Sequence, residues 1–151
     1  ATYLLGTISG QLVIALAQMA LLIVFGVFAM GLNWGQSPLA LGLMLVTFGL
    51  AASAFGTALG AFIKTEGQAS GLSVMLGMSL ALMGGCWYPL ELFPEAVRTA
   101  VHVLPTTWAM RGLMDIVLRG QDLSGVMLEA AVLTGFAVVF FAVGVWRFKY
   151  E

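Results

Sequence analysis

The first 63 residues of the chain contain no Asp, Glu, Lys or Arg, and the first charged residue is Lys64. Two more charge-free runs cover residues 67–90 and 130–146. Helices of a water-soluble domain need charged residues on their outer faces, whereas the interior of a bilayer excludes them. Because 61% of the residues are hydrophobic and only 9% are charged, the sequence predicts an all-α integral membrane protein.

Four transmembrane helices are predicted from the apolar runs and the turn residues between them, over about residues 3–32, 38–63, 69–88 and 124–146. Ser37 and Pro38 provide an N-cap and a first-turn proline for the second helix. Six of the seven Trp and Tyr residues lie near a predicted helix end, as expected for side chains that prefer the headgroup layer. Because the chain begins with Ala1 inside apolar sequence, we expect residues 1–151 to be a partial transmembrane domain of a longer polypeptide.

Residues 89–123 differ from the rest because they carry seven of the thirteen charged residues and three of the four prolines. Two short amphipathic helices are predicted here, over about residues 94–104 and 108–119, with a threonine after Pro105 as the N-cap of the second. Each is too short to cross a bilayer. We therefore expect a helical hairpin over about residues 89–120, which either re-enters the membrane or lies flat on its surface.

Seven ionisable residues are candidates for an outer gate or a transport path: Glu91, Glu95, Arg98, Arg111, Asp115, Arg119 and Glu129. Arg111, Asp115 and Arg119 are four residues apart and would form a cation–anion–cation ladder along one helix. Such a ladder either stabilises its helix or closes a gate. Glu129 lies one turn into the last helix. It is either a functional group inside the membrane or a carboxylate stabilised by the helix N-terminus.

Small residues recur every four positions on the second predicted helix, at Ala52, Gly56 and Gly60. Small side chains let helix backbones approach closely, so these residues predict a packing face. The neighbour is either another helix of the same chain, which is the interpretation we adopt, or a second subunit. The nine methionines are either adaptable packing residues or a forgiving surface for varied lipophilic substrates.

Enzyme chemistry is not indicated by any motif in the sequence. A Gly-x-x-x-x-Gly-Lys-Ser/Thr loop for nucleotide phosphates is absent. The single histidine, His102, and the single cysteine, Cys86, supply neither a catalytic pair nor a metal site. With only one cysteine, the chain cannot form an internal disulfide. Six scattered basic residues form no nucleic-acid surface. We therefore expect no catalytic, cofactor-binding or metal-binding residues in the chain.

Two segments of the hairpin region resemble a known family. Residues 84–95, GGCWYPLELFPE, are similar to the end of the fifth span and the following turn of type-2 ABC exporter permeases. Residues 104–113, LPTTWAMRGL, are similar to the second re-entrant helix of that family. The four predicted spans would then be the last of six. The charges alone do not predict the orientation, because three basic residues lie on each side of the membrane. The resemblance implies one: residues 89–123 face outside, and Lys64 and the C-terminal tail face the cytoplasm.

The resemblance implies a permease subunit of an ATP-driven ABC exporter that moves a lipophilic or amphiphilic substrate, such as a drug or a lipid-linked molecule, out of the cytoplasm. It also implies a separate ABC ATPase subunit that binds the ATP, a second copy of the permease or a homologous one, multidrug efflux as a use, and a bacterial inner membrane. The chain itself would not be an enzyme. The alternative is a non-transporting membrane scaffold or assembly factor, which would need no ATPase partner.

Overall fold

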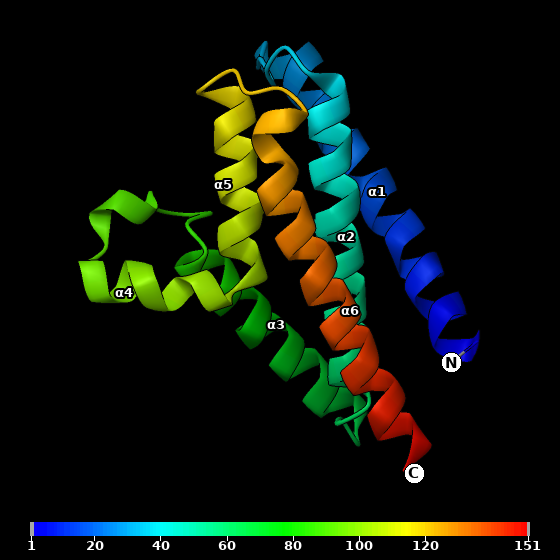
Figure 1. Cartoon of the computed structure of the whole chain (residues 1–151). Coiled ribbons are helices and arrows are strands. Elements are labelled where there is room, and N and C mark those ends of the chain that lie inside the picture. The colour runs from blue at the N-terminus through cyan, green and yellow to red at the C-terminus, as the bar shows by residue number, and fades with distance from the viewer. Residues whose placement is uncertain (1, 151) are drawn as a thin grey trace.

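The computed structural model describes residues 2–150, and these residues form α-helices and short 3₁₀ helices without a strand (Figure 1). The six α-helices are α1 (Thr2–Met30), α2 (Pro38–Gly60), α3 (Glu66–Met83), α4 (Glu95–Ala100), α5 (Pro105–Val117) and α6 (Met127–Lys149). The three 3₁₀ helices are η1 (Leu90–Leu92), η2 (Val101–Val103) and η3 (Ser124–Val126). The predicted all-α fold is confirmed.

The centre of the molecule is a layer formed by α2 and α6, which run side by side in the same direction (Figure 1). Small residues make this contact close: an added Cβ on Gly144 of α6 would lie 3.7 Å from the Cα of Ala58 on α2. Helix α1 packs on one side of α2, and α5 packs against both α2 and α6. Met44, Ile116 and Leu133 bring side chains from α2, α5 and α6 into the shared core.

Three helices are long and apolar enough to cross a membrane: α1, α2 and the stretch Ser124–Lys149 that ends with α6. They coincide with three of the four predicted spans, and the helix ends lie within a few residues of the predicted ones. Helix α3 is not among these candidates in the described part of the chain. It also ends at Met83 rather than near residue 88, because Gly84 and Gly85 stop it and Gly85 takes a left-handed conformation with φ of +88°.

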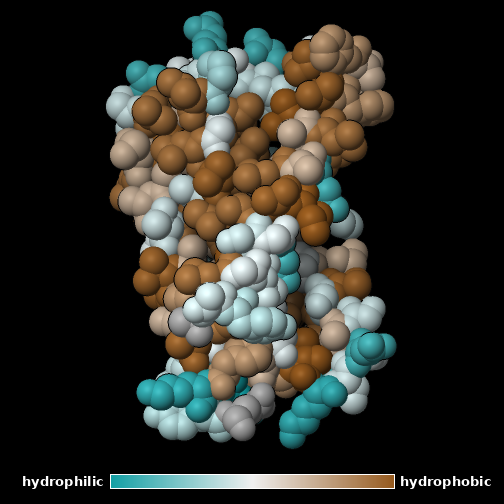
Figure 2. All heavy atoms as spheres, turned by 90° about the vertical axis from the view of Figure 1, so that its right-hand side faces the viewer, coloured by the Kyte–Doolittle hydropathy of each residue, from teal (hydrophilic) through white to brown (hydrophobic). Residues whose placement is uncertain are grey.

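Hydrophobic side chains cover much of the face that α1 presents, and hydrophilic residues gather at the two ends of the molecule (Figure 2). In α1 only Leu4, Ile8 and Gly26 are buried. A protein that exposes a helix this apolar along its length would aggregate in water, whereas the hydrocarbon interior of a bilayer is a favourable solvent for such a helix. The fold is therefore that of an integral membrane protein.

Helices α4 and α5 lie in the segment of the predicted hairpin, but the capping of α5 differs from the prediction. Ser37 caps α2 as predicted, its hydroxyl accepting from the Ala40 amide at 3.3 Å. Neither Thr106 nor Thr107 caps α5, whose N-cap is Leu104. Instead, the Thr106 hydroxyl donates to the carbonyl of Leu80 on α3 at 2.7 Å. The prediction failed because α5 begins at Pro105, about three residues earlier than predicted, so that Thr106 and Thr107 lie inside its first turn rather than before it.

The small-residue stripe at Ala52, Gly56 and Gly60 lies on the surface of the described part of the chain. All three residues are exposed, and a Cβ added at Gly60 would meet nothing within 4 Å. Helix α2 buries a neighbouring face instead, which includes Ala51 and Ala58. A Cβ added at Gly56 would lie 3.9 Å from Oε1 of Gln11 on α1, and contact of this stripe within the chain stays a prediction. Contact with a second subunit stays a prediction.

Candidate functional site

Helix α5 positions two of the seven ionisable candidates, Arg111 and Asp115, and a third, Arg119, follows just after its end. Pro105 starts the helix, and its buried face contains Thr107, Gly112 and Ile116. This face packs between α2 and α6, so the charged residues of α5 lie close to the start of α6. In Figure 1, α5 climbs from the level of α4 to the end of the molecule that also carries the α1–α2 connection.

Arg111 of α5 forms an ion pair with Glu129 of α6. The Nε of Arg111 lies 3.6 Å from Oε1 of Glu129, and the Glu129 side chain is only 5% exposed whereas that of Arg111 is 45% exposed. The Arg111 guanidinium also lies over the Trp108 ring, 5.5 Å from its centroid. Among residues 2–150, Glu129 Oε2 has no hydrogen-bond partner. Glu129 is therefore a buried carboxylate whose ionic partner reaches towards the surface.

Asp115 pairs with Arg119 one turn further along α5, and the two make a short hydrogen-bonded ion pair. The predicted three-residue ladder is therefore only half formed, because Arg111 bonds to Glu129 rather than to Asp115. Both carboxylates are nearly buried, with side-chain exposures of 5% for Glu129 and 11% for Asp115, so each needs a cation, and Arg119 supplies the one for Asp115. Sequence spacing showed the intrahelical neighbours of Arg111 and could not show the interhelical one.

Of the remaining candidates, which lie on the segment before α5, Glu91 lies close to Arg111, Asp115 and Arg119, whereas Glu95 and Arg98 do not join this group. Glu91 lines a hollow of about 340 Å³ together with His102, Arg111 and Arg119. Glu95 and Arg98 are exposed on α4. Within the described residues, none of Glu91, Glu95 and Arg98 forms an ion pair.

His102 has a structural role at the bend before α5. Its Nδ1 lies 2.6 Å from the Arg98 carbonyl oxygen and donates to it in the tautomer that this contact requires. Its own carbonyl accepts from Trp108 Nε1 at 2.8 Å. The two rings meet edge to face with centroids 5.7 Å apart. These contacts fix the angle between the short helices of the hairpin.

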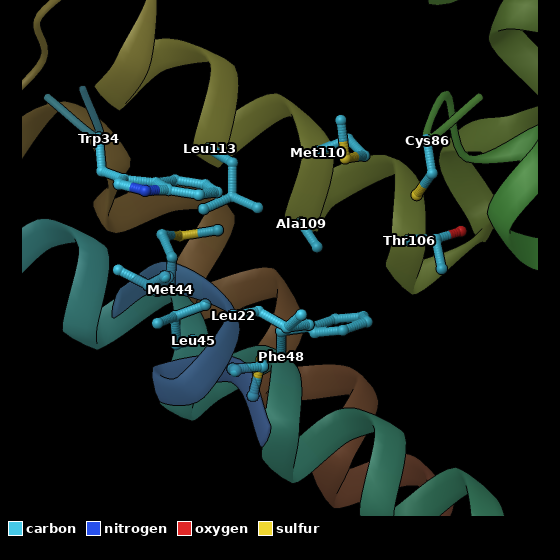
Figure 3. A pocket seen from close by; sticks show the side chains of 12 residues that line it. Leu22, Trp34, Met44, Leu45, Phe48, Cys86, Thr106, Ala109, Met110 and Leu113 are labelled. Carbon is cyan, nitrogen blue, oxygen red and sulfur yellow. The ribbon is translucent and has the colours of Figure 1, made fainter. Parts of the chain in front are cut away.

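A cavity of about 270 Å³ lies between α1, α2 and α5, and the sequence did not predict it (Figure 3). Its wall includes Leu22 from α1, Met44 and Phe48 from α2, and Ala109, Met110 and Leu113 from α5. Trp34 from the α1–α2 connection and Cys86 from the turn after α3 complete the lining. The methionines were a partial signal for this cavity, since flexible thioethers suit irregular apolar spaces, but their spacing could not bring three helices together.

Comparison with known proteins identifies the family. Residues 1–146 match the sequence profile of the family described as ABC-2 family transporter protein. The chain belongs to the ABC-2 transporter family. The helical membrane fold agrees with that membership, and the family supports a role as the membrane subunit of a transport permease.

Two curated bacterial relatives of this ABC-2 chain come from Bacillus subtilis (strain 168). One is the linearmycin resistance permease protein LnrN, 25% identical over 139 residues, which are 92% of this chain and 36% of the relative. The other is YvfS, provisionally named a transport permease, 30% identical over 120 residues, which are 79% of this chain and 49% of the relative. The chain thus spans between a third and a half of the length of these relatives. No solved structure matches it.

Proposed function

We propose that this ABC-2 chain is the C-terminal membrane portion of a permease subunit in an ATP-driven exporter of the bacterial inner membrane. The family match over residues 1–146 carries the proposal. One relative is named for resistance to linearmycin, and resistance is a natural consequence of moving a compound out of the cell. A separate ABC ATPase would bind and hydrolyse the ATP, and a second copy of the permease, or a homologous one, would complete the transport path.

A lipophilic or amphiphilic substrate fits the described surface best. The cavity beside α5 has an almost entirely apolar lining, and α1 exposes hydrophobic side chains along most of its length. A small hydrophilic substrate would need hydrogen-bonding side chains that converge on a hollow, and the apolar wall beside α5 offers few. Drugs and lipid-linked molecules that dissolve in the bilayer are therefore the proposed cargo, with multidrug efflux as one use.

In this proposal α3 is a fourth span, and the segment from η1 to α5 is a re-entrant hairpin. Helix α3 has 18 residues, so it is about 27 Å long at 1.5 Å per residue, close to the hydrocarbon thickness of a bilayer. The Thr106–Leu80 hydrogen bond joins the start of α5 to α3. A backbone that turns at membrane depth must be surrounded by protein, and the packing of α5 against α2 and α6 supplies that surrounding.

The outer gate is assigned to the ion pairs of α5. Arg111–Glu129 ties α5 to α6, and Asp115–Arg119 places a further charge pair one turn nearer the outer end. Glu91, Glu95 and Arg98 would contribute from the surface of the hairpin. In a dimer, closure of the ATPases would rock the spans, and the hairpin would open or close the outer end of the path between the subunits.

The deciding experiment uses the complete polypeptide. It would be purified gently from its native membrane, its co-purifying proteins identified by mass spectrometry, and its ATP hydrolysis measured. We expect a stoichiometric ABC ATPase and ATP hydrolysis. Repeated isolation of an intact complex with no ATPase protein and no ATP hydrolysis would overturn the exporter proposal in favour of a membrane scaffold or assembly factor.

A further inference from the structure

The cavity between α1 and α5 has the properties of a ligand site rather than of a packing defect. Both helices pack against α2, and the cavity separates them. Its volume of about 270 Å³ exceeds that of the dry apolar cavities, of about 150 Å³, that bind benzene or xenon. The cavity is open on one side, so apolar wall atoms there lack the dispersion contacts that a protein neighbour would supply. An occupant would restore those contacts.

The cavity opens towards the surroundings of the helix bundle. Leu22 lines it and is 65% exposed, and Cys86 at its other end is also exposed. Helix α1 is apolar enough to span a membrane, and hydrocarbon surrounds a spanning helix wherever no other protein segment covers it. The molecules that can reach this opening are therefore those dissolved in the bilayer.

The wall of the cavity offers few free hydrogen-bonding groups, which favours an apolar occupant. The Thr106 hydroxyl is already engaged with the Leu80 carbonyl. Trp34 is one of the wall residues, and its Nε1 has no hydrogen-bond partner among residues 2–150. Tryptophan prefers the headgroup level, so the Trp34 end of the cavity lies near the membrane surface and the rest lies deeper.

We propose that this cavity binds the hydrocarbon chain of an amphiphile that enters from the bilayer. The chain lies against Met44, Ala109 and Met110, whose thioethers adapt to chains of different shape. The amphiphile is either a bilayer phospholipid or a transported molecule with a similar tail. Identification of the occupant as cargo rests on the proposed export function, whereas hydrocarbon binding does not.

The test uses the complete polypeptide in phosphatidylcholine nanodiscs that contain a phospholipid with a diazirine in one acyl chain. After irradiation, peptide mass spectrometry locates the crosslinks. We expect the cavity walls of α2 and α5 to be labelled more strongly than Phe25 and Phe28, which line a groove formed by α1 alone. Equal labelling of the cavity and of that groove would overturn the proposal.

Two substitutions fill the cavity, and one matched substitution does not. Ala109→Leu adds a branched side chain to the cavity wall. The larger side chain would keep about two methylene groups of the bound hydrocarbon chain out of the cavity, so it should lower cavity labelling about tenfold. Leu113→Phe fills the cavity from the next turn of α5 and guards against misfolding of the first variant. Ala20→Leu, at an exposed position of α1, is the control and should leave labelling unchanged. Unchanged labelling in both filling variants would also overturn the proposal.

Competition identifies the source of the hydrocarbon chain. Displacement of the label by excess oleate would support an exchangeable amphiphile, as expected for cargo. Retention of the label under excess oleate would support a resident phospholipid. Labelling of the cavity requires no ATPase, so the two proposals can fail separately. If a complex exports actively but its cavity is not labelled, the cavity site alone is refuted. If the cavity is labelled but the complex contains no ATPase, the export proposal alone is refuted.

Discussion

Met44 of α2 occupies the space that a Cβ would take on Gly112 of α5. A Cβ built there would overlap the terminal methyl and the sulfur of Met44, and would lie 3.4 Å from the Cβ of Glu129. Met44 is 1% exposed and also lines the apolar cavity. Gly112 thus lets α5 approach α2 and α6 at the place where the ion pair and the cavity are adjacent.

Gly112→Ala should therefore change the cavity more than the fold. The added methyl displaces the flexible end of Met44 into the cavity, while alanine improves the helix propensity of α5 by about 1 kcal/mol. We expect a change in unfolding free energy within about 1 kcal/mol and a clear drop in acyl-chain labelling. Thermal unfolding and photocrosslinking of the same preparation check both. Undiminished labelling would show that Met44 moves elsewhere.

Arg111→Gln should destabilise the protein more than Glu129→Gln does. The first change leaves a carboxylate buried without its cation, at a cost of about 1–3 kcal/mol. The second leaves a half-exposed guanidinium that the surroundings can still solvate. The double variant should behave like Glu129→Gln, because the buried charge is gone. Thermal unfolding of all three variants measures this order, and equal, additive losses would contradict it.

Asp115→Ala should impair export and leave assembly intact. The substitution removes a nearly buried carboxylate and leaves behind Arg119, whose side chain is 65% exposed and stays solvated, so we expect the loss to cost little stability. The measurement is substrate efflux from vesicles that contain the complete complex, with co-purification of the ATPase as the assembly control. Full efflux activity in this variant would remove the gate role from Asp115.

Gly84→Ala should loosen α3 from α5. A Cβ at Gly84 would overlap the Thr106 side chain, whose hydroxyl holds the Leu80 carbonyl. Few other contacts join α3 to the rest of the chain, so we expect faster amide hydrogen exchange along α3. Gly77→Ala is the control within the same helix, since a Cβ at Gly77 would meet nothing within 4 Å. Equal exchange in the two variants would argue against the Thr106 contact.

The helices that the sequence located correctly are those whose limits are set by local chemistry. The bounds of α1, α2 and α6 differ from the predicted spans by a few residues, because a long charge-free run ends where polar and turn-forming residues begin. The break before α5 was predicted from Pro105 alone. The end of α3 was misplaced, since the apolar residues after Gly85 look like span and only the backbone conformation of that glycine shows otherwise.

The sequence by itself determined the class of the protein, because burial in hydrocarbon requires long apolar helices and leaves few alternatives. Tertiary structure alone decided that Arg111 pairs with Glu129, that Ala52, Gly56 and Gly60 are exposed in the described chain, and that three helices line an open cavity. Helical periodicity groups residues into faces. The rotation and tilt of each helix, which arise from packing against its neighbours, select the face that meets another helix.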